Sequence, residues 1–237
     1  MPHELRAPFF EIGPKNYLSR KELLELAAAA STAAAEYGVS VVITPPVLDL
    51  EAVKASEPEL WVFAQGMDLA EPGPSTGALL PESLAQVGAD GVLLNHPERA
   101  VSDEDIAAGI RRARACGLLT MVWADDEDQS RKLASYGPDI VLCEPRRLIG
   151  TAAHLDRPWI PQVNKAVAEV APHALVMHGG GIADPSDVLH VMAQGADGTG
   201  CTSAVVLARD RPAVARSLVH AVRLGWDRRI TQCAAPA

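Results

Sequence analysis

The chain has 237 residues, a net charge of −9 at pH 7 and a pI of about 5.2. Hydrophobic residues make up 48% of it, which is enough apolar surface for a core and excludes a chain that is disordered throughout. Non-specific binding to nucleic acid requires Lys and Arg side chains that neutralise phosphates, so the acidic composition argues against a nucleic-acid partner.

Short, nearly continuous apolar runs predict eight parallel β-strands that are covered on both faces. In chain order they span residues 8–13, 39–44, 61–65, 91–95, 118–123, 140–144, 174–178 and 197–201. Helical segments lie between them, including short ones at 48–55 and 81–88.

The helix boundaries are marked by recognisable residues. Ser19 with Glu22 three positions later is a capping box, and Ser102 and Asp184-Pro185 mark similar helix starts. Glycine ends the helices, because it adopts the left-handed conformation at no steric cost. The predicted stops are Gly38, Gly88, Gly117, Gly137 and Gly195.

Strands and helices that alternate in this way predict an α/β fold, a single-domain (β/α)8 TIM barrel spanning residues 1–237. A doubly wound open sheet is the main structural alternative, but the first strand is not followed by a GxGxxG turn. Aromatic residues make up only 4% of the chain, so we expect Ala, Val and Leu to fill the interior.

The four cysteines are far apart and form no CxxC pair. This spacing predicts neither a disulfide framework nor a zinc site, and it is typical of free thiols in a reducing cytosol. The cysteines are Cys116, Cys143, Cys201 and Cys233. The first ten residues lack the pattern of a signal peptide, and no apolar run approaches the ~18–20 residues of a membrane helix. We therefore expect a cytoplasmic protein with no membrane partner.

Reactive groups of a barrel gather where its strands end. Lys15 follows the first predicted strand, His96 follows the fourth and Glu144 ends the sixth. The glycines at 179–181 and the segment 202–204 follow the last two strands, where backbone N–H groups commonly bind phosphate. Each feature alone is typical of a surface charge, a structural histidine or a tight turn, but together they indicate a functional site.

These segments resemble the triosephosphate isomerase family, especially its compact archaeal-type branch, and suggest a divergent bacterial-type paralogue. The lid segment Glu-Pro-x-x-x-Ile-Gly-Thr at residues 144–151 is the most specific part, and the resemblance covers essentially the whole chain in the family's order. The other matching segments are Lys15, 62–65, 76–82, 93–98, 118–122, 179–182 and Ser203.

The resemblance implies an aldose–ketose isomerase of the glyceraldehyde 3-phosphate/dihydroxyacetone phosphate type, which moves a proton through an enediolate without a cofactor or metal ion. It implies that Glu144 is the base, that His96 polarises the carbonyl group and shuttles the hydroxyl proton, and that Lys15 stabilises negative charge. Glu98 and Gln65 would support these three residues without reacting themselves.

The resemblance also implies a phosphate site beneath a lid of residues 145–151 that closes over the substrate and keeps water away. The residues expected to hold the phosphate, largely through backbone N–H groups, are Gly150, Gly180, Gly181, Ser203 and Ala204.

Three positions depart from the family's pattern. Gly13 replaces an Asn that donates a hydrogen bond to the oxyanion, Pro97 replaces a Ser, and Ala152 replaces a Gly. Because Gly13 removes a side chain, we expect open space beside the reacting carbons. This motivates an alternative substrate, a tetrulose phosphate or another short sugar phosphate.

Other functions compete with this interpretation. A barrel that binds a sugar phosphate without turning it over would have no use for Glu144. Ser75 within G-x-S-x-G and the His-Gly-Gly-Gly segment at 178–181 are typical of esterases, but they occur in the wrong order and context. A Schiff-base aldolase would need a desolvated lysine, with Lys15 and Lys165 as candidates.

The loop at residues 73–77 resembles the family's long loop after the third strand, which packs against a partner subunit. We therefore expect a homo-oligomer, either a dimer or a tetramer. The seven histidines are scattered without metal-ligand spacing, so no metal site is expected.

Overall fold

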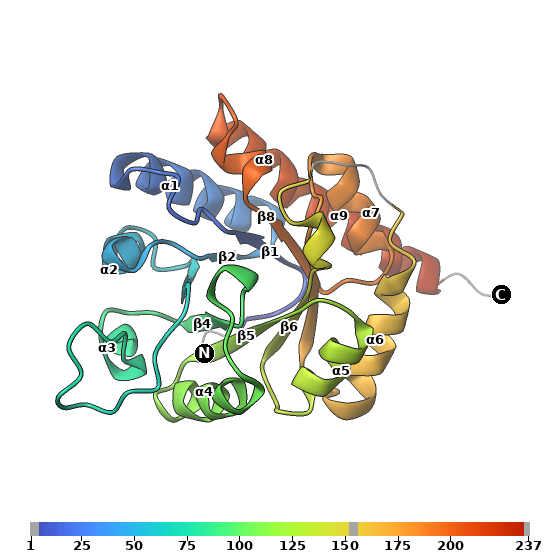
Figure 1. Ribbon diagram of the computed structural model, residues 1–237. Coiled ribbons are helices and arrows are strands. Elements are labelled where there is room, and N and C mark those ends of the chain that lie inside the picture. The colour runs from blue at the N-terminus through green and yellow to red at the C-terminus, as the bar shows by residue number, and fades with distance from the viewer. Residues whose placement is uncertain (1–4, 152–155, 235–237) are drawn as a thin grey trace.

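The computed structural model describes residues 5–151 and 156–234, and its strands form a closed parallel barrel (Figure 1). Each strand pairs with its neighbours in sequence, and the last pairs with the first through Phe9 and Gly198. The strands are β1 (Phe9–Ile12), β2 (Ser40–Ile43), β3 (Trp61–Ala64), β4 (Gly91–Leu94), β5 (Leu119–Ala124), β6 (Ile140–Cys143), β7 (Leu175–His178) and β8 (Gly198–Cys201). The predicted barrel is confirmed.

The helices surround this barrel. The α-helices are α1 (Arg20–Tyr37), α2 (Leu50–Ser56), α3 (Pro81–Gln86), α4 (Asp103–Ala115), α5 (Glu127–Ala134), α6 (Trp159–Val170), α7 (Pro185–Ala193), α8 (Ser203–Val206) and α9 (Arg211–Ala234). Three short 3-10 turns, η1 (Val47–Asp49), η2 (Pro97–Arg99) and η3 (Arg146–Leu148), follow β2, β4 and β6. Strict alternation of strands and α-helices fails after β8, where α8 precedes the long helix α9 that packs on α1 and α7.

The predicted helix boundaries are confirmed by their hydrogen bonds. Ser19 accepts from the Glu22 N–H while the Glu22 carboxylate accepts from the Ser19 N–H, which completes a capping box. Asp184 caps α7 in the same way with Asp187. The five predicted glycine stops all have positive φ, as at Gly38 with φ +61°.

The hydrophobic core has two layers, one on each side of the barrel wall. Between strands and helices the buried residues are mostly Ala, Val, Leu and Ile, as expected. Inside the barrel the expectation is wrong, because this cluster includes Phe9, Trp61, Phe63 and Trp123. The few aromatic residues are placed where glycines make room: a Cβ at Gly198 would lie 2.5 Å from the Phe9 ring.

Cys116, Cys143 and Cys201 are free thiols, and the side chain of Cys233 lies outside the described part of the chain. Burial raises the pKa of the Cys143 thiol to about 12, so this thiol is unreactive at neutral pH. Within residues 5–151 and 156–234, no helix combines the length and the apolar character needed to cross a bilayer.

Candidate active site

A cavity of about 650 Å³ opens at the carboxyl ends of the strands. Loops from distant parts of the chain meet around it, because all eight strands point the same way. Of the predicted site residues, those that line the cavity are Lys15, Gln65, His96, Glu98, Glu144, Gly150, Gly180, Gly181 and Ser203. Ala204, in the first turn of α8, does not line it.

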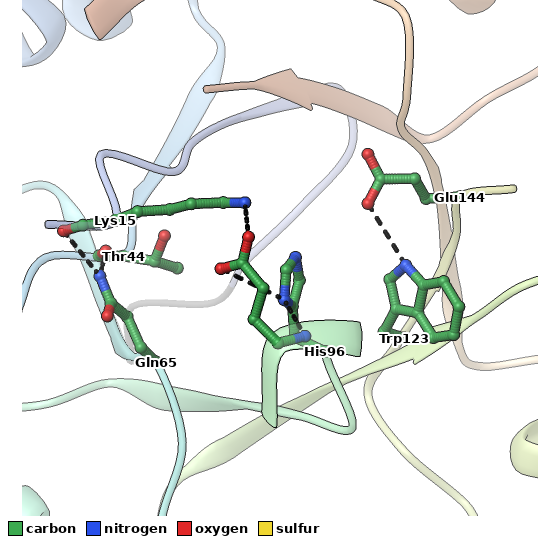
Figure 2. A network of polar contacts seen from close by, with 7 residues as sticks. Lys15, Thr44, Gln65, His96, Trp123 and Glu144 are labelled. Atoms are coloured by element: carbon green, nitrogen blue, oxygen red, sulfur yellow. Dashed lines mark hydrogen bonds and ion pairs between the residues drawn. The ribbon is translucent and has the colours of Figure 1, made fainter. Parts of the chain in front are cut away.

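Lys15 reaches the cavity from a strained backbone position. Its φ is +45°, which is unfavourable for a residue with a side chain. The Gln65 amide nitrogen donates to the carbonyl oxygens of both Lys15, at 3.1 Å, and Thr44, at 2.9 Å. Gln65 thus holds the loop after β1 against β2, and we infer that it maintains the Lys15 conformation (Figure 2).

The Lys15 ammonium nitrogen lies 2.5 Å from Oε1 of Glu98. The Glu98 side chain is 61% exposed, so water screens this pair and the lysine can turn toward an anion in the cavity at little cost. Lys15 is therefore placed to neutralise a ligand's negative charge.

His96 begins the turn η2, and the backbone determines which ring nitrogen carries the proton. The Glu98 N–H donates to Nδ1 of His96 over 3.2 Å, so the neutral ring carries its proton on Nε2. Partial burial lowers the pKa of the His96 imidazole, and the charge of Lys15 lowers it further. The ring is consequently a neutral hydrogen-bond donor at neutral pH.

Glu144 follows β6 and is oriented by a tryptophan of β5. The Trp123 indole N–H donates to Oε2 of Glu144 over 3.3 Å (Figure 2). Desolvation raises the pKa of the Glu144 carboxyl above its usual value, while the Trp123 hydrogen bond opposes the shift. A carboxylate with a raised pKa is a stronger base, which suits it to abstract a weakly acidic proton.

The lid segment 145–151 is anchored by its own turn. Leu148 is buried, and its carbonyl oxygen accepts from the Thr151 N–H at 3.1 Å and from the Thr151 hydroxyl at 2.8 Å. Gly150 has φ +73° and no atom near its Cβ position, so backbone conformation rather than crowding favours glycine there. Ala152, one of the departures noted above, lies outside the described residues.

The open space expected beside Gly13 is absent. A Cβ built at this position would lie 3.0 Å from Oε1 and 3.4 Å from Oε2 of Glu11, and 3.2 Å from the Thr202 hydroxyl oxygen. The carboxyl group of Glu11 thus crowds the position that the missing Cβ would have occupied. The Cβ position of Gly13 therefore offers no open space of the kind that motivated a larger substrate.

The esterase interpretation and one of the two aldolase candidates lose their structural basis. The Ser75 hydroxyl donates to the Glu71 carbonyl in the loop after β3 and does not line the cavity. His178 is buried, its Nε2 lies 2.8 Å from Oδ1 of Asn164, and desolvation lowers its pKa to about 3. Lys165 is exposed on α6, away from the barrel interior. Among the described residues no His, Cys, Asp and Glu side chains cluster as a metal site would require.

Sequence reasoning missed three residues of this site, namely Glu11, Thr44 and Trp123. Glu11 could have been found, because alternation along β1 places it on the same inner face as Phe9, where a charged side chain is out of place. Thr44 and Trp123 had no comparable signal, since their contribution depends on the strand register.

Comparison with known proteins agrees with this geometry. Residues 11–219 match the family model described as triosephosphate isomerase. The chain is 39% identical over 212 residues to the triosephosphate isomerase of Methanopyrus kandleri, covering 87% of this chain and 94% of that protein. The corresponding enzymes of Sulfolobus acidocaldarius and Cenarchaeum symbiosum are each 32% identical, covering 91% and 92% of this chain and 95% and 99% of those proteins. The chain therefore belongs to the triosephosphate isomerase family.

Proposed function

We propose that this protein is a triosephosphate isomerase-like enzyme that interconverts glyceraldehyde 3-phosphate and dihydroxyacetone phosphate. The observation that carries the proposal is the meeting of Lys15, His96 and Glu144 around one cavity. They supply a cation, a neutral hydrogen-bond donor and a carboxylate base, and together these groups suit proton transfer next to a carbonyl group.

The reaction balances with these groups alone. The Glu144 carboxylate takes a proton from the carbon next to the carbonyl group, and the electron pair moves onto the carbonyl oxygen to form an enediolate. The His96 Nε2–H stabilises this oxyanion, and the ring moves the hydroxyl proton from one oxygen of the enediolate to the other. Lys15 offsets the negative charge. Glu144 then returns its proton to the neighbouring carbon, which gives the isomeric sugar phosphate.

The phosphate would lie against the glycine-rich loop after β7, beneath the lid. Gly180 and Gly181 have φ of +82° and +65°, and both line the cavity together with Gly150 and Ser203. Backbone N–H groups of such loops bind phosphate without cationic side chains. Ala204 would contribute through its N–H in the first turn of α8.

The steady-state rate of triose phosphate isomerisation tests this function. Glu144→Gln should lower kcat by several orders of magnitude and leave KM within a few fold, because an amide cannot accept the proton. Glu127→Gln, at an exposed glutamate of α5, is the matched control and should behave as wild type. Equal activity of the two variants, or an inactive wild type, would refute the proposal.

We further propose that the protein is a cytoplasmic homo-oligomer. Free thiols at Cys116, Cys143 and Cys201 suit a reducing compartment. The loop between β3 and α3 extends outward from the barrel in Figure 1 and is available to a second copy. Sedimentation equilibrium should give a mass that is a multiple of 25.1 kDa, and a monomer at micromolar concentration would contradict the proposal.

A further inference from the structure

The carboxyl group of Glu11 belongs to β1, a strand whose other side chains are apolar. Oε1 accepts a hydrogen bond from the buried Thr44 hydroxyl at 2.7 Å. Gly200 on the adjacent strand β8 makes room for it, since a Cβ there would lie 2.8 Å from that of Glu11. Among the described residues none hydrogen-bonds to Oε2, and Glu11 lines the cavity.

This carboxyl group stands in for a side chain at position 13. Both of its oxygens lie within 3.4 Å of the Cβ position of Gly13, where the family resemblance implies an asparagine. A protonated carboxyl group carries one hydrogen-bond donor and one acceptor oxygen, so it can replace the donor and the acceptor of a carboxamide. An ionised carboxylate only accepts, and it would repel an enediolate.

The surroundings of Glu11 favour the protonated form. Desolvation raises its pKa and the Glu144 charge adds to this, while the Thr44 hydrogen bond and Lys15 oppose it, with a result of about 7. Among the described residues Cys201 on β8 is a further titratable neighbour, and its own pKa is raised by burial, so it stays neutral. Because Thr44 donates to Oε1, the proton of the acid form belongs on Oε2.

We propose that Glu11 is a further catalytic residue, whose protonated carboxyl group donates a hydrogen bond from Oε2 to the substrate oxygen that becomes the oxyanion. It replaces the donor that Gly13 lacks. The inference rests on the proposed isomerase function, and it adds to that function a donor that is lost as pH rises.

Comparison of Glu11→Ala with Glu11→Gln separates the effect of a hydrogen-bond donor on kcat from the effect of a carboxylate charge. Loss of one oxyanion donor lowers kcat on the order of 10²-fold, and we expect this for Glu11→Ala with KM within a few fold. Glu11→Gln keeps a donor of similar shape and should retain at least about a tenth of the wild-type kcat by the same reasoning. If Glu11→Gln loses as much as Glu11→Ala, or if Glu11→Ala is as active as wild type, the inference is wrong.

A double variant distinguishes loss of the hydrogen-bond donor in Glu11→Ala from general damage to its fold. Gly13 does not have a positive φ, so its backbone accepts asparagine. Gly13→Asn alone should lose activity, because its Cβ would crowd the Glu11 carboxyl group at 3.0 Å. The double variant, Glu11→Ala with Gly13→Asn, should recover at least about tenfold over Glu11→Ala, since the amide donor returns. A double variant no better than Glu11→Ala would count against the inference.

The pH profile gives a readout that a purely structural role would not move. The wild-type kcat/KM should fall as pH rises above about 7, because the donor is lost through the pKa of Glu11. In Glu11→Gln this alkaline limb should move to higher pH. In Thr44→Val the limb should also move to higher pH, because the hydrogen bond that lowers the Glu11 pKa is gone. An alkaline limb that is the same in all three proteins would overturn the inference.

One measurement does not depend on turnover. The infrared difference spectrum of the free protein between about pH 5 and about pH 9 should show a protonated carboxyl group that titrates near neutrality in the wild type and disappears in Glu11→Gln. A wild type that isomerises no triose phosphate refutes the proposed function and the inference with it. An active wild type whose Glu11 carboxyl is ionised throughout this range refutes the inference alone.

Discussion

Replacement of Gln65 by leucine tests how the protein holds Lys15 in place. The Gln65 amide nitrogen makes two hydrogen bonds to backbone carbonyl groups, at 3.1 Å to Lys15 and 2.9 Å to Thr44. At about 1 kcal/mol net for each bond, Gln65→Leu should reduce the free energy of unfolding by about 2 kcal/mol. Without this contact the strained φ of +45° at Lys15 loses a restraint.

The effect on activity should be larger than the effect on stability suggests. A displacement of Lys15 by about 1 Å would lower kcat/KM on the order of 10²-fold, because the ammonium group would no longer face the developing charge. Urea denaturation and steady-state kinetics of the same preparation measure both quantities. Gln86→Leu, at an exposed position of α3, is the matched control and should change stability by less than about 0.5 kcal/mol. If Gln65→Leu matches this control in denaturation midpoint and turnover, Gln65 does not position Lys15.

Three further predictions follow from contacts in and below the cavity. Trp123→Phe removes a hydrogen bond that lowers the pKa of Glu144, so the acid limb of kcat/KM should shift to higher pH, and an unmoved limb would contradict the role of Trp123. Gly180→Ala should lower kcat and the free energy of unfolding, the latter by about 1–2 kcal/mol, because φ is +82° and the new Cβ would lie 2.9 Å from the Cβ of Leu148. Wild-type kinetics together with a wild-type denaturation midpoint would exclude this crowding. Gly198→Ala would place a methyl group 2.5 Å from a phenylalanine ring inside the barrel, and thermal unfolding should show a loss of about 1–3 kcal/mol unless the ring can move away.

The fold was predictable because its signals are local. The capping box at Ser19 and the glycine stop at Gly38 each depend on a few neighbouring residues, and both form as the sequence indicates. The doubling of helices after β8 had no such signal, because α8 is a single short turn. The interior was misjudged for a different reason: composition counts aromatic residues, but it does not say that Phe9 and Trp123 lie inside the barrel.

The site was predictable in its parts and not in its contacts. Lys15, His96 and Glu144 stand at strand ends, and a parallel barrel brings strand ends together. The family resemblance singled out Gly13, but the expectation that it leaves open space beside its Cβ position was wrong. Whether a gap remains at Gly13 depends on the side chain of Glu11, two residues earlier, which turns toward that position. No rule of sequence spacing describes that conformation.

The transfer of deuterium from solvent to carbon tests the central claim most directly, because it follows the proton that Glu144 is proposed to move. In D2O the wild type should introduce deuterium at the carbon next to the carbonyl group of triose phosphate, and NMR should detect it in substrate and product. Glu144→Gln should abolish this exchange, while Glu127→Gln should leave it at the wild-type rate. Exchange that persists in Glu144→Gln, or isomerisation by the wild type without any deuterium at carbon, would contradict the account.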